Sequence, residues 1–195
     1  MKKCLISLMV LFLAVGAFGA TYTPASYEGT TTAITGSNSV AVVEVGHVIR
    51  KSVLTVSDVS LVIDGSGGAG WGTAQLGVFP EGRILVLGVT VSGMDIATNA
   101  TELVALDEGD FSLGTTATAD NTIDGTDVNL CPSTGIAVGT AANSALAANA
   151  QFDGTTTPVP IHANFIVDDG DVGAGSYTNT FDAVVTITYV NLGDY

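Results

Sequence analysis

The sequence predicts an all-β fold, arranged as a two-layer antiparallel β-sandwich that is jelly-roll-like and contains little helix. Only 12% of the 195 residues are charged, and 24 are glycine. Polar positions are therefore mostly Thr, Ser, Asn and Asp, which suit strands and turns better than surface helices. About eight runs rich in Val, Ile, Leu and Thr are separated by Gly, Pro and Asp clusters, and no internal repeat of fixed period is present.

Residues 1–19 have the pattern of a secretory signal peptide, in which Lys2 and Lys3 precede an apolar run that ends in small residues. The run covers about 14 residues, fewer than the roughly 20 that a membrane-spanning helix needs. We expect cleavage after Gly19, with cleavage after Ala17 as the second choice. An uncleaved anchor and a buried N-terminal helix stay open as alternatives. The leader predicts export, with no stable membrane insertion once it is removed.

The body of the chain begins after the leader. Residues 20–38 are polar and rich in turn formers, which indicates an extended N-terminal arm of the kind that can order on a neighbouring subunit. The β-sandwich domain is expected to cover residues 39–195. Its first strands are expected at residues 39–46 and 53–63, separated by the basic pair Arg50 and Lys51.

The glycine-rich stretch at residues 64–72, DGSGGAGWG, formally fits a dinucleotide-binding fingerprint. In that motif the glycines open a helix whose N-terminus receives the pyrophosphate. Here Trp71, Gly72 and a strand-like run follow instead. The stretch therefore predicts a hairpin loop and not a nucleotide site.

Two further hairpins are expected. Residues 73–79 and 83–92 flank Pro80, Glu81 and Gly82, in which proline presets one φ and glycine allows a positive one. Residues 160–167 and 183–192 flank a loop rich in Asp and Gly, and both faces of the last strand carry apolar residues. That strand is expected to lie inside a sheet that is covered on both sides.

Between these hairpins the strand pattern is weaker. Short strands are expected at residues 103–106 and 110–113, followed by a long polar connection. The alanine-rich run at residues 141–150 is expected to form one short helix, which Asn143 and Asn149 weaken.

The charge balance excludes one class of function. The chain has 19 acidic and 5 basic residues, and without the leader only Arg50, Lys51 and Arg83 remain as bases. Nucleic-acid affinity depends on Lys and Arg that neutralise phosphates, so DNA or RNA binding is not expected.

Cys4 lies in the leader and Cys131 is alone in the body, so no disulfide within the mature chain is possible. Cys131 is expected to be a small buried hydrophobe.

No catalytic constellation is visible. His47 and His162 are the only histidines, each in or beside a strand, and structural roles are expected for both. A glycosidase needs two acids across a cleft with sugar-binding walls, and Trp71 is the single tryptophan available to build one. The protein is expected not to be an enzyme.

Two acidic loops are candidates for a structural Ca²⁺, and they are the only cofactor sites that the sequence offers. Asp168, Asp169 and Asp171 place three carboxylates within four residues, near enough to share one ion if the loop curls. Asp120, Asp124 and Asp127 fit part of a calcium loop, but Thr122 holds its third position and Cys131 stands where a bidentate Glu belongs. Turn formation explains both loops equally well.

Four stretches carry a resemblance to known proteins: residues 76–88 (LGVFPEGRILVLG), 110–115 (DFSLGT), 152–157 (FDGTTT) and 164–195, which ends in VNLGDY. They resemble a loosely defined group of bacteriophage-encoded β proteins that are associated with virions as head decoration or minor structural components. The resemblance implies a non-catalytic protein that packs against a shell or against its own copies. The leader departs from it, since phage heads assemble in the cytoplasm.

Two hypotheses follow. The first is a structural protein of a virion or of an extracellular assembly, with self-association or a protein shell as the partner. The second is an exported cell-surface β-sandwich module, stabilised by Ca²⁺ if an acidic loop binds it, that recognises a glycan or a protein. The location is extracellular if the leader is a signal peptide, and the virion is the alternative.

Overall fold

A computed structural model describes residues 34–36, 39–46, 48–65, 69–98, 108–137, 139, 142–146, 150–167, 172 and 175–193. The chain is almost entirely β, and every strand pair is antiparallel. The elements are β1 (Thr35–Gly36), β2 (Val40–Gly46), β3 (Ile49–Gly65), β4 (Gly70–Val78), β5 (Gly82–Ile96), β6 (Glu108–Gly114), a 3-10 turn η1 (Gly125–Asp127), β7 (Cys131–Ala137), β8 (Ala142–Leu146), β9 (Ala150–Gly154), β10 (Pro160–Val167) and β11 (Gly175–Asn191).

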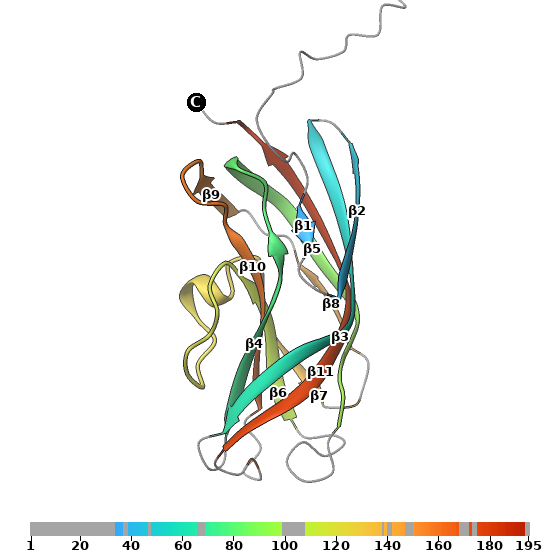
Figure 1. Ribbon diagram of the computed structural model, residues 1–195, viewed down its shortest axis with the longest axis vertical. Helices are drawn as coiled ribbons and strands as arrows, with labels where there is room; N and C mark the ends of the chain where they lie inside the picture. Colours follow the sequence, from blue (N-terminus) through green and yellow to red (C-terminus); the bar gives the residue numbers. More distant parts are fainter. Residues whose placement is uncertain are drawn as a thin grey trace, which may run out of the picture.

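The strands form one curled sheet in the order β7-β6-β10-β4-β3-β11-β5-β8. β1 adds to β4, β2 to β3 and β9 to β5. The curl folds the sheet into two facing layers, with β4, β6 and β10 on one side and β2, β3 and β5 on the other (Figure 1). The predicted all-β antiparallel sandwich is confirmed.

The spine of the sheet is the pairing of β3 with β11, which runs from Ile49 opposite Val190 to Gly65 opposite Gly175. One bulge interrupts it, where two residues of β3, Ser57 and Asp58, oppose the single residue Asp182 of β11. Asp58 takes a positive φ of 51° in this bulge, and its amide donates a 2.9 Å hydrogen bond to Asp182 Oδ1. The extra residue restores the alternation, so that Val56 and Val59 both point into the core.

Both predicted hairpins around Pro80 and around residues 168–174 are wrong as strand pairings. β4 pairs with β10, β3 and β1, whereas β5 pairs with β11, β8 and β9. Phe79 and Pro80 are buried, so the short connection crosses between the layers instead of turning back along one. Gly82 has the predicted positive φ, at 122°, and a Cβ there would meet the Asn191 side chain. β10 likewise pairs with β4 and β6, and not with β11.

Several local expectations need correction. The predicted helix at residues 141–150 is wrong: β8 and the start of β9 occupy this stretch and pair with β5, so sheet hydrogen bonds override the helix propensity of alanine. Arg50 and Lys51 do not separate two strands but belong to β3. β11 lies inside the sheet as expected, but only one of its faces is covered, since Val184 on the other is 38% exposed.

Other expectations are confirmed, and some concern residues that the structure does not describe. Strands occur at the predicted positions of β2, β6 and β10, and Cys131 is buried. The glycine-rich stretch joins two paired strands as predicted, but its ends belong to β3 and β4, since Gly65 lies opposite Gly70 and Asp64 opposite Trp71. Ile34 is buried and β1 pairs with β4, so the sheet begins ahead of residue 39. The leader, residues 20–33 of the arm and the strand expected at 103–106 lie outside the described residues.

Two aromatic clusters connect the layers. Phe111, Phe165 and Phe181 come from β6, β10 and β11, and the ring centroids of Phe165 and Phe181 are 4.8 Å apart in an edge-on arrangement. Phe79 contacts Tyr189 and Phe152 at centroid distances of 5.7 and 5.8 Å. These rings bury large apolar areas between the two layers of the sheet.

We expect Phe181→Ala to lower the free energy of unfolding by about 3–5 kcal/mol, because it leaves a cavity between three strands. Chemical denaturation measures this change. Val184→Ala, three residues further along β11 on the exposed face, serves as the control and should change stability by less than about 1 kcal/mol. Equal losses for the two variants would contradict the assigned layers.

Candidate assembly surface

The predicted calcium loop with Asp120, Asp124 and Asp127 lies around η1, where these residues form local turns. Asp120 Oδ1 accepts a 2.9 Å hydrogen bond from the Thr122 amide, and the Asp124 carbonyl accepts one from the Asp127 amide. Partial burial raises the pKa of Asp127, and the nearby charges of Asp124 and Asp120 raise it further. Within the described residues, no three His, Cys, Asp or Glu side chains are placed to hold a metal.

The second predicted calcium loop, with Asp168, Asp169 and Asp171, lies outside the described residues, as does His47. Calcium binding therefore stays a prediction. His162 lies on β10, where burial lowers the pKa of its imidazole and Nδ1 is 3.5 Å from Thr73 Oγ1.

A buried asparagine attaches the η1 loop to the sheet. Asn164 on β10 accepts hydrogen bonds from the Thr118 amide and the Thr73 hydroxyl through Oδ1. Its Nδ2 donates to the carbonyl oxygens of Thr116 and Asp127, at 3.0 Å each. These four bonds satisfy a fully buried amide, so the acidic loop is held by the core.

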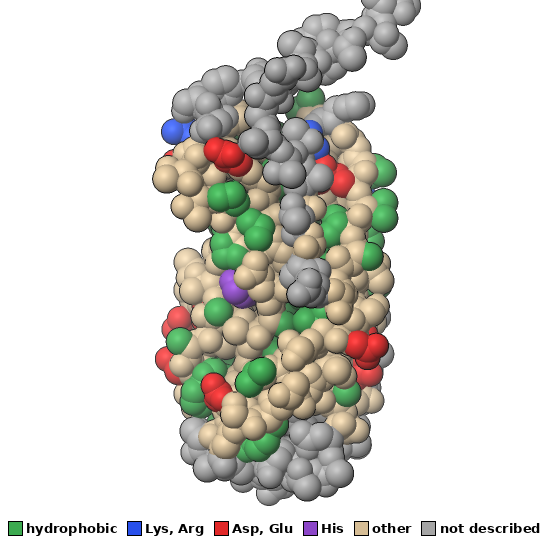
Figure 2. Space-filling model, viewed as in Figure 1, with side chains coloured by type: hydrophobic (Ala, Val, Ile, Leu, Met, Phe, Trp, Pro, Cys, Tyr) green, Lys and Arg blue, Asp and Glu red, His purple; other side chains and the backbone are tan. Residues whose placement is uncertain are grey.

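Exposed large hydrophobic side chains gather in one layer of the sandwich. Within the described residues they all lie on β2, β3, β5, β11 or the chain next to these strands: Val43, Val45, Val48, Ile49, Val62, Leu87, Val184 and Leu192. The four most exposed belong to the hairpin of β2 and β3, with exposed fractions between 57% for Ile49 and 71% for Val48. Figure 2 shows hydrophobic side chains along the right-hand edge of the molecule, where Figure 1 places β2.

Five of these residues, Val43, Val45, Ile49, Leu87 and Val184, belong to a wider surface that we term the outer face. The strand register places outward-facing residues of neighbouring strands opposite each other: Val43 lies opposite Val53, Val53 opposite Thr186, and Thr186 opposite Thr90. The outer face comprises Ala41, Val43, Val45, Ile49, Lys51, Val53, Thr55, Leu85, Leu87, Thr90, Val184, Thr186, Thr188 and Val190. Lys51 is the one charged residue in this set, and the same side of the sheet continues into Arg83 on β5 and into Asp182 on β11, which lies opposite Asp95.

Beneath the outer face, Glu44 points inward from β2 and joins three strands. Its carboxylate accepts hydrogen bonds of 2.6 Å from Arg50 Nη1, from Ser52 Oγ and from the Tyr189 hydroxyl. Burial alone would raise the pKa of Glu44, but the hydrogen bonds from Ser52, Tyr189 and Arg50 outweigh it and lower this pKa. Burial and the hydrogen bond to Glu44 raise the pKa of the Tyr189 phenol, which therefore stays protonated and donates.

The sequence indicated the strand at residues 39–46 but did not single out Glu44 or Tyr189. Its alternation was the available signal, because Val40, Val42 and Glu44 share one face while Ala41, Val43 and Val45 share the other. A carboxylate on the more buried face of an apolar strand needs partners, and only the fold shows that they come from β3 and β11.

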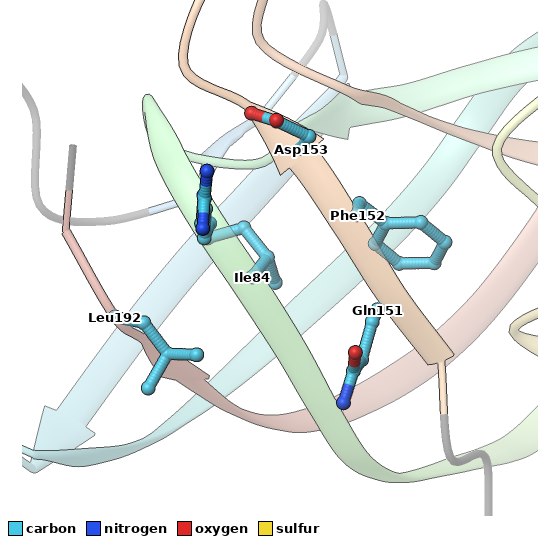
Figure 3. A pocket seen from close by; sticks show the side chains of 6 residues that line it. Ile84, Gln151, Phe152, Asp153 and Leu192 are labelled. Carbon is cyan, nitrogen blue, oxygen red and sulfur yellow. The ribbon is translucent and has the colours of Figure 1, made fainter. Parts of the chain in front are cut away.

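A shallow depression lies beside the outer face, at the start of β5. It has a volume of about 370 Å³ and is lined by Arg83, Ile84, Gln151, Phe152, Asp153 and Leu192 (Figure 3). Arg83 and Asp153 are opposite each other in the pairing of β5 with β9, and the Phe152 ring also contacts Phe79. The depression therefore combines polar groups with part of an aromatic ring.

The fold defines an antiparallel all-β sandwich with an apolar outer layer. Comparison with protein families, with curated proteins and with solved structures found no match. Among the described residues, no helix has the length and apolar character to span a membrane. The resemblance to virion-associated phage proteins stays a prediction.

We expect Glu44 to make stability depend on pH. Its folded pKa is lowered, so its contribution is present above the unfolded pKa of about 4.3 and is lost as pH falls through the folded pKa. The difference in unfolding free energy between the wild type and Glu44→Gln should therefore shrink as pH is lowered from 7 to 3. Urea denaturation across this range measures the difference. Ser52→Ala, which removes one donor, should weaken the dependence, and a difference that is constant with pH would contradict the network.

If Asp168, Asp169 and Asp171 bind Ca²⁺, the melting temperature should rise when CaCl₂ replaces EDTA, because an ion bound only by the folded state stabilises it. Asp169→Asn combined with Asp171→Asn should abolish the rise. Asp120→Asn combined with Asp124→Asn is the matched control for the other loop. An unchanged melting temperature of the wild type in EDTA would exclude a structural ion.

Proposed function

We propose that the protein is a non-catalytic structural component of a virion or of an extracellular assembly. The outer face is the observation that supports this proposal most. Monomeric proteins seldom expose a contiguous apolar surface of several hundred Å², and such surfaces usually contact another protein. Here valine, leucine, isoleucine and threonine cover most of one layer, next to a strand whose side chains are 60–65% exposed at Val43 and Val45.

The composition supports the same proposal. An acidic chain keeps individual copies soluble and separated by charge repulsion until a specific surface brings them together. A surface of Val and Thr on strands is rigid, since β-branched side chains lose little freedom when a partner covers them. The signal-like leader favours an extracellular assembly, and the resemblance at residues 76–88 and 164–195 favours a virion.

Fractionation of the source cells and their medium tests the proposal. We expect the protein in fractions of high mass that contain particles or filaments by electron microscopy, labelled by an antibody against this chain. Val43→Lys combined with Val45→Lys should move it to the fraction of free protein, because two desolvated charges oppose burial of the outer face. Wild-type protein that occurs only as a monomer in the medium, with none in any assembly, would overturn the proposal.

The depression at Arg83 favours a second candidate, an exported module that binds a glycan or a protein. Its volume lies within the range of small-ligand sites, and Arg83, Gln151 and Asp153 supply donors and acceptors. A glycan array probed with the wild type and with Gln151→Ala would separate the candidates. Binding that depends on Gln151, by a protein found in no assembly, would favour the module over the structural protein.

A further inference from the structure

Three carboxylates lie side by side at one end of the outer face. Asp182 on β11 lies opposite Asp95 on β5, and on its other side it faces the bulge of β3 that contains Asp58. Each of the three is next to a buried residue of its own strand, so the side chains point away from the core. On the right-hand edge of Figure 2, acidic side chains follow below the hydrophobic ones. We term Asp58, Asp95 and Asp182 the acidic row.

The acidic row has no compensating charge among the described residues. Like charges directly opposite each other in a sheet destabilise it. The described bases are Arg50, Lys51 and Arg83, and all three lie toward the other end of these strands. Asp95 Oδ1 is buried and has no hydrogen-bond partner within the described part of the chain. A positive group from outside the chain would therefore stabilise this row.

The opposite end of the outer face carries such a group. Lys51 is exposed on β3 opposite Thr188, and no described residue forms an ion pair with it, whereas Arg50 is bound to Glu44. The outward residues of β3 and β11 between Lys51 and the acidic row are uncharged: Val53, Thr55, Val184 and Thr186. One face thus has a positive end, an uncharged middle and a negative end.

This pattern selects a second copy in one orientation. The formal net charge of −14 opposes association of two copies in general. Charges farther apart than about 8 Å are largely screened at physiological ionic strength, so the charges that meet at a contact determine which contact forms. A two-fold axis that crosses the strands between Val53 and Thr55 places Lys51 of each copy against the acidic row of the other. A basic partner would instead face Lys51, and an acidic partner would face the acidic row.

The face is large enough for such a contact. Four strands about 4.8 Å apart, each about ten residues long at about 3.3 Å per residue, cover on the order of 600 Å². Two copies would then hide about 1,200 Å², which is the lower end of the range for specific complexes. In the same orientation Val53 and Thr186 of one copy lie over Thr55 and Val184 of the other, so the uncharged middles cover each other.

We propose that two copies of this chain pack with their outer faces together and their strands reversed, so that Lys51 of each copy pairs with the acidic row of the other. The contact is isologous, as in most two-fold dimers. It rests on the proposed function and deepens it, because it names the partner that covers the outer face.

Charge exchange between the two ends provides the test. Sedimentation over a range of concentrations is measured for the wild type, for an acidic variant (K51E), for a basic variant (D58N with D95K and D182N) and for an equal mixture of the two variants. Asparagine keeps the oxygen acceptor at position 182 and tolerates the positive φ at position 58. All samples contain EDTA, so that no metal ion bridges the carboxylates.

We expect the wild type to dimerise and each variant alone to dimerise at least tenfold more weakly, because like charges then meet at both ends of the contact. The mixture should recover dimers that contain one copy of each variant. The basic variant also separates this contact from general repulsion. Its substitutions reduce the negative charge of each copy, so repulsion between whole copies would make it dimerise more strongly than the wild type.

Asp124→Lys is the matched control, since Asp124 is exposed beside η1 and its side chain makes no capping hydrogen bond. It should dimerise like the wild type. Circular dichroism and melting curves identify any variant that fails to fold. If the basic variant does not fold, K51E decides alone, because a folded K51E that dimerises like the wild type would overturn the contact.

The outcomes separate this inference from the proposed function. A mixture that stays as monomeric as its components would overturn the contact, and so would a wild type that dimerises only when EDTA is left out. In either case high-mass assemblies in the fractionation experiment would leave the structural role standing. A wild type that dimerises as expected but occurs in no assembly would support the contact and overturn the structural role.

Discussion

The antiparallel pairing of β3 with β11 is the constraint on which the rest of the structure depends. These two 17-residue strands lie at the centre of the sheet, and every other described strand except β6 and β7 pairs with one of them or with one of their neighbours β4 and β5. The bulge at Asp58 keeps core residues inward on both sides of it, with Asp182 accepting a hydrogen bond from its amide. Without the bulge the register would slip by one residue, and the apolar side chains beyond Asp58 would face solvent.

The two faces of this spine have different physical roles. Inward, Phe181, Val185 and Ile187 meet the facing layer and bury apolar area, which is the main favourable term in folding. Outward, Val184, Thr186 and Thr188 contribute to the outer face, where few charges are available to keep copies apart. The same register that builds the core therefore also aligns the surface that we assign to assembly. Glu44 joins these two roles, because its inward carboxylate leaves the β2 edge neutral.

Local patterns predicted where strands lie far better than they predicted which strands pair. Runs of strand-forming residues located β2 and β10, and Pro80 with Gly82 correctly marked a change of chain direction. The hairpin inferred there was wrong because burial of Phe79 turns the chain across the sandwich, and that burial depends on Tyr189 and Phe152, far away in sequence. The helix predicted for the alanine-rich run was wrong for a related reason. Its weak helix propensity lost to the hydrogen bonds that the edge of β5 offered.

The sequence by itself determined the fold class, the buried state of Cys131 and the acidic character of the chain. These follow from composition and alternation, which act on each residue whatever its distant neighbours. Only the tertiary structure decided that β10 and β11 pair with other strands and not with each other, that Asn164 anchors the η1 loop, and that Glu44 is bound by Arg50, Ser52 and Tyr189. Strand order and buried polar partners depend on contacts between residues up to 145 positions apart, and a periodic pattern carries no record of such contacts.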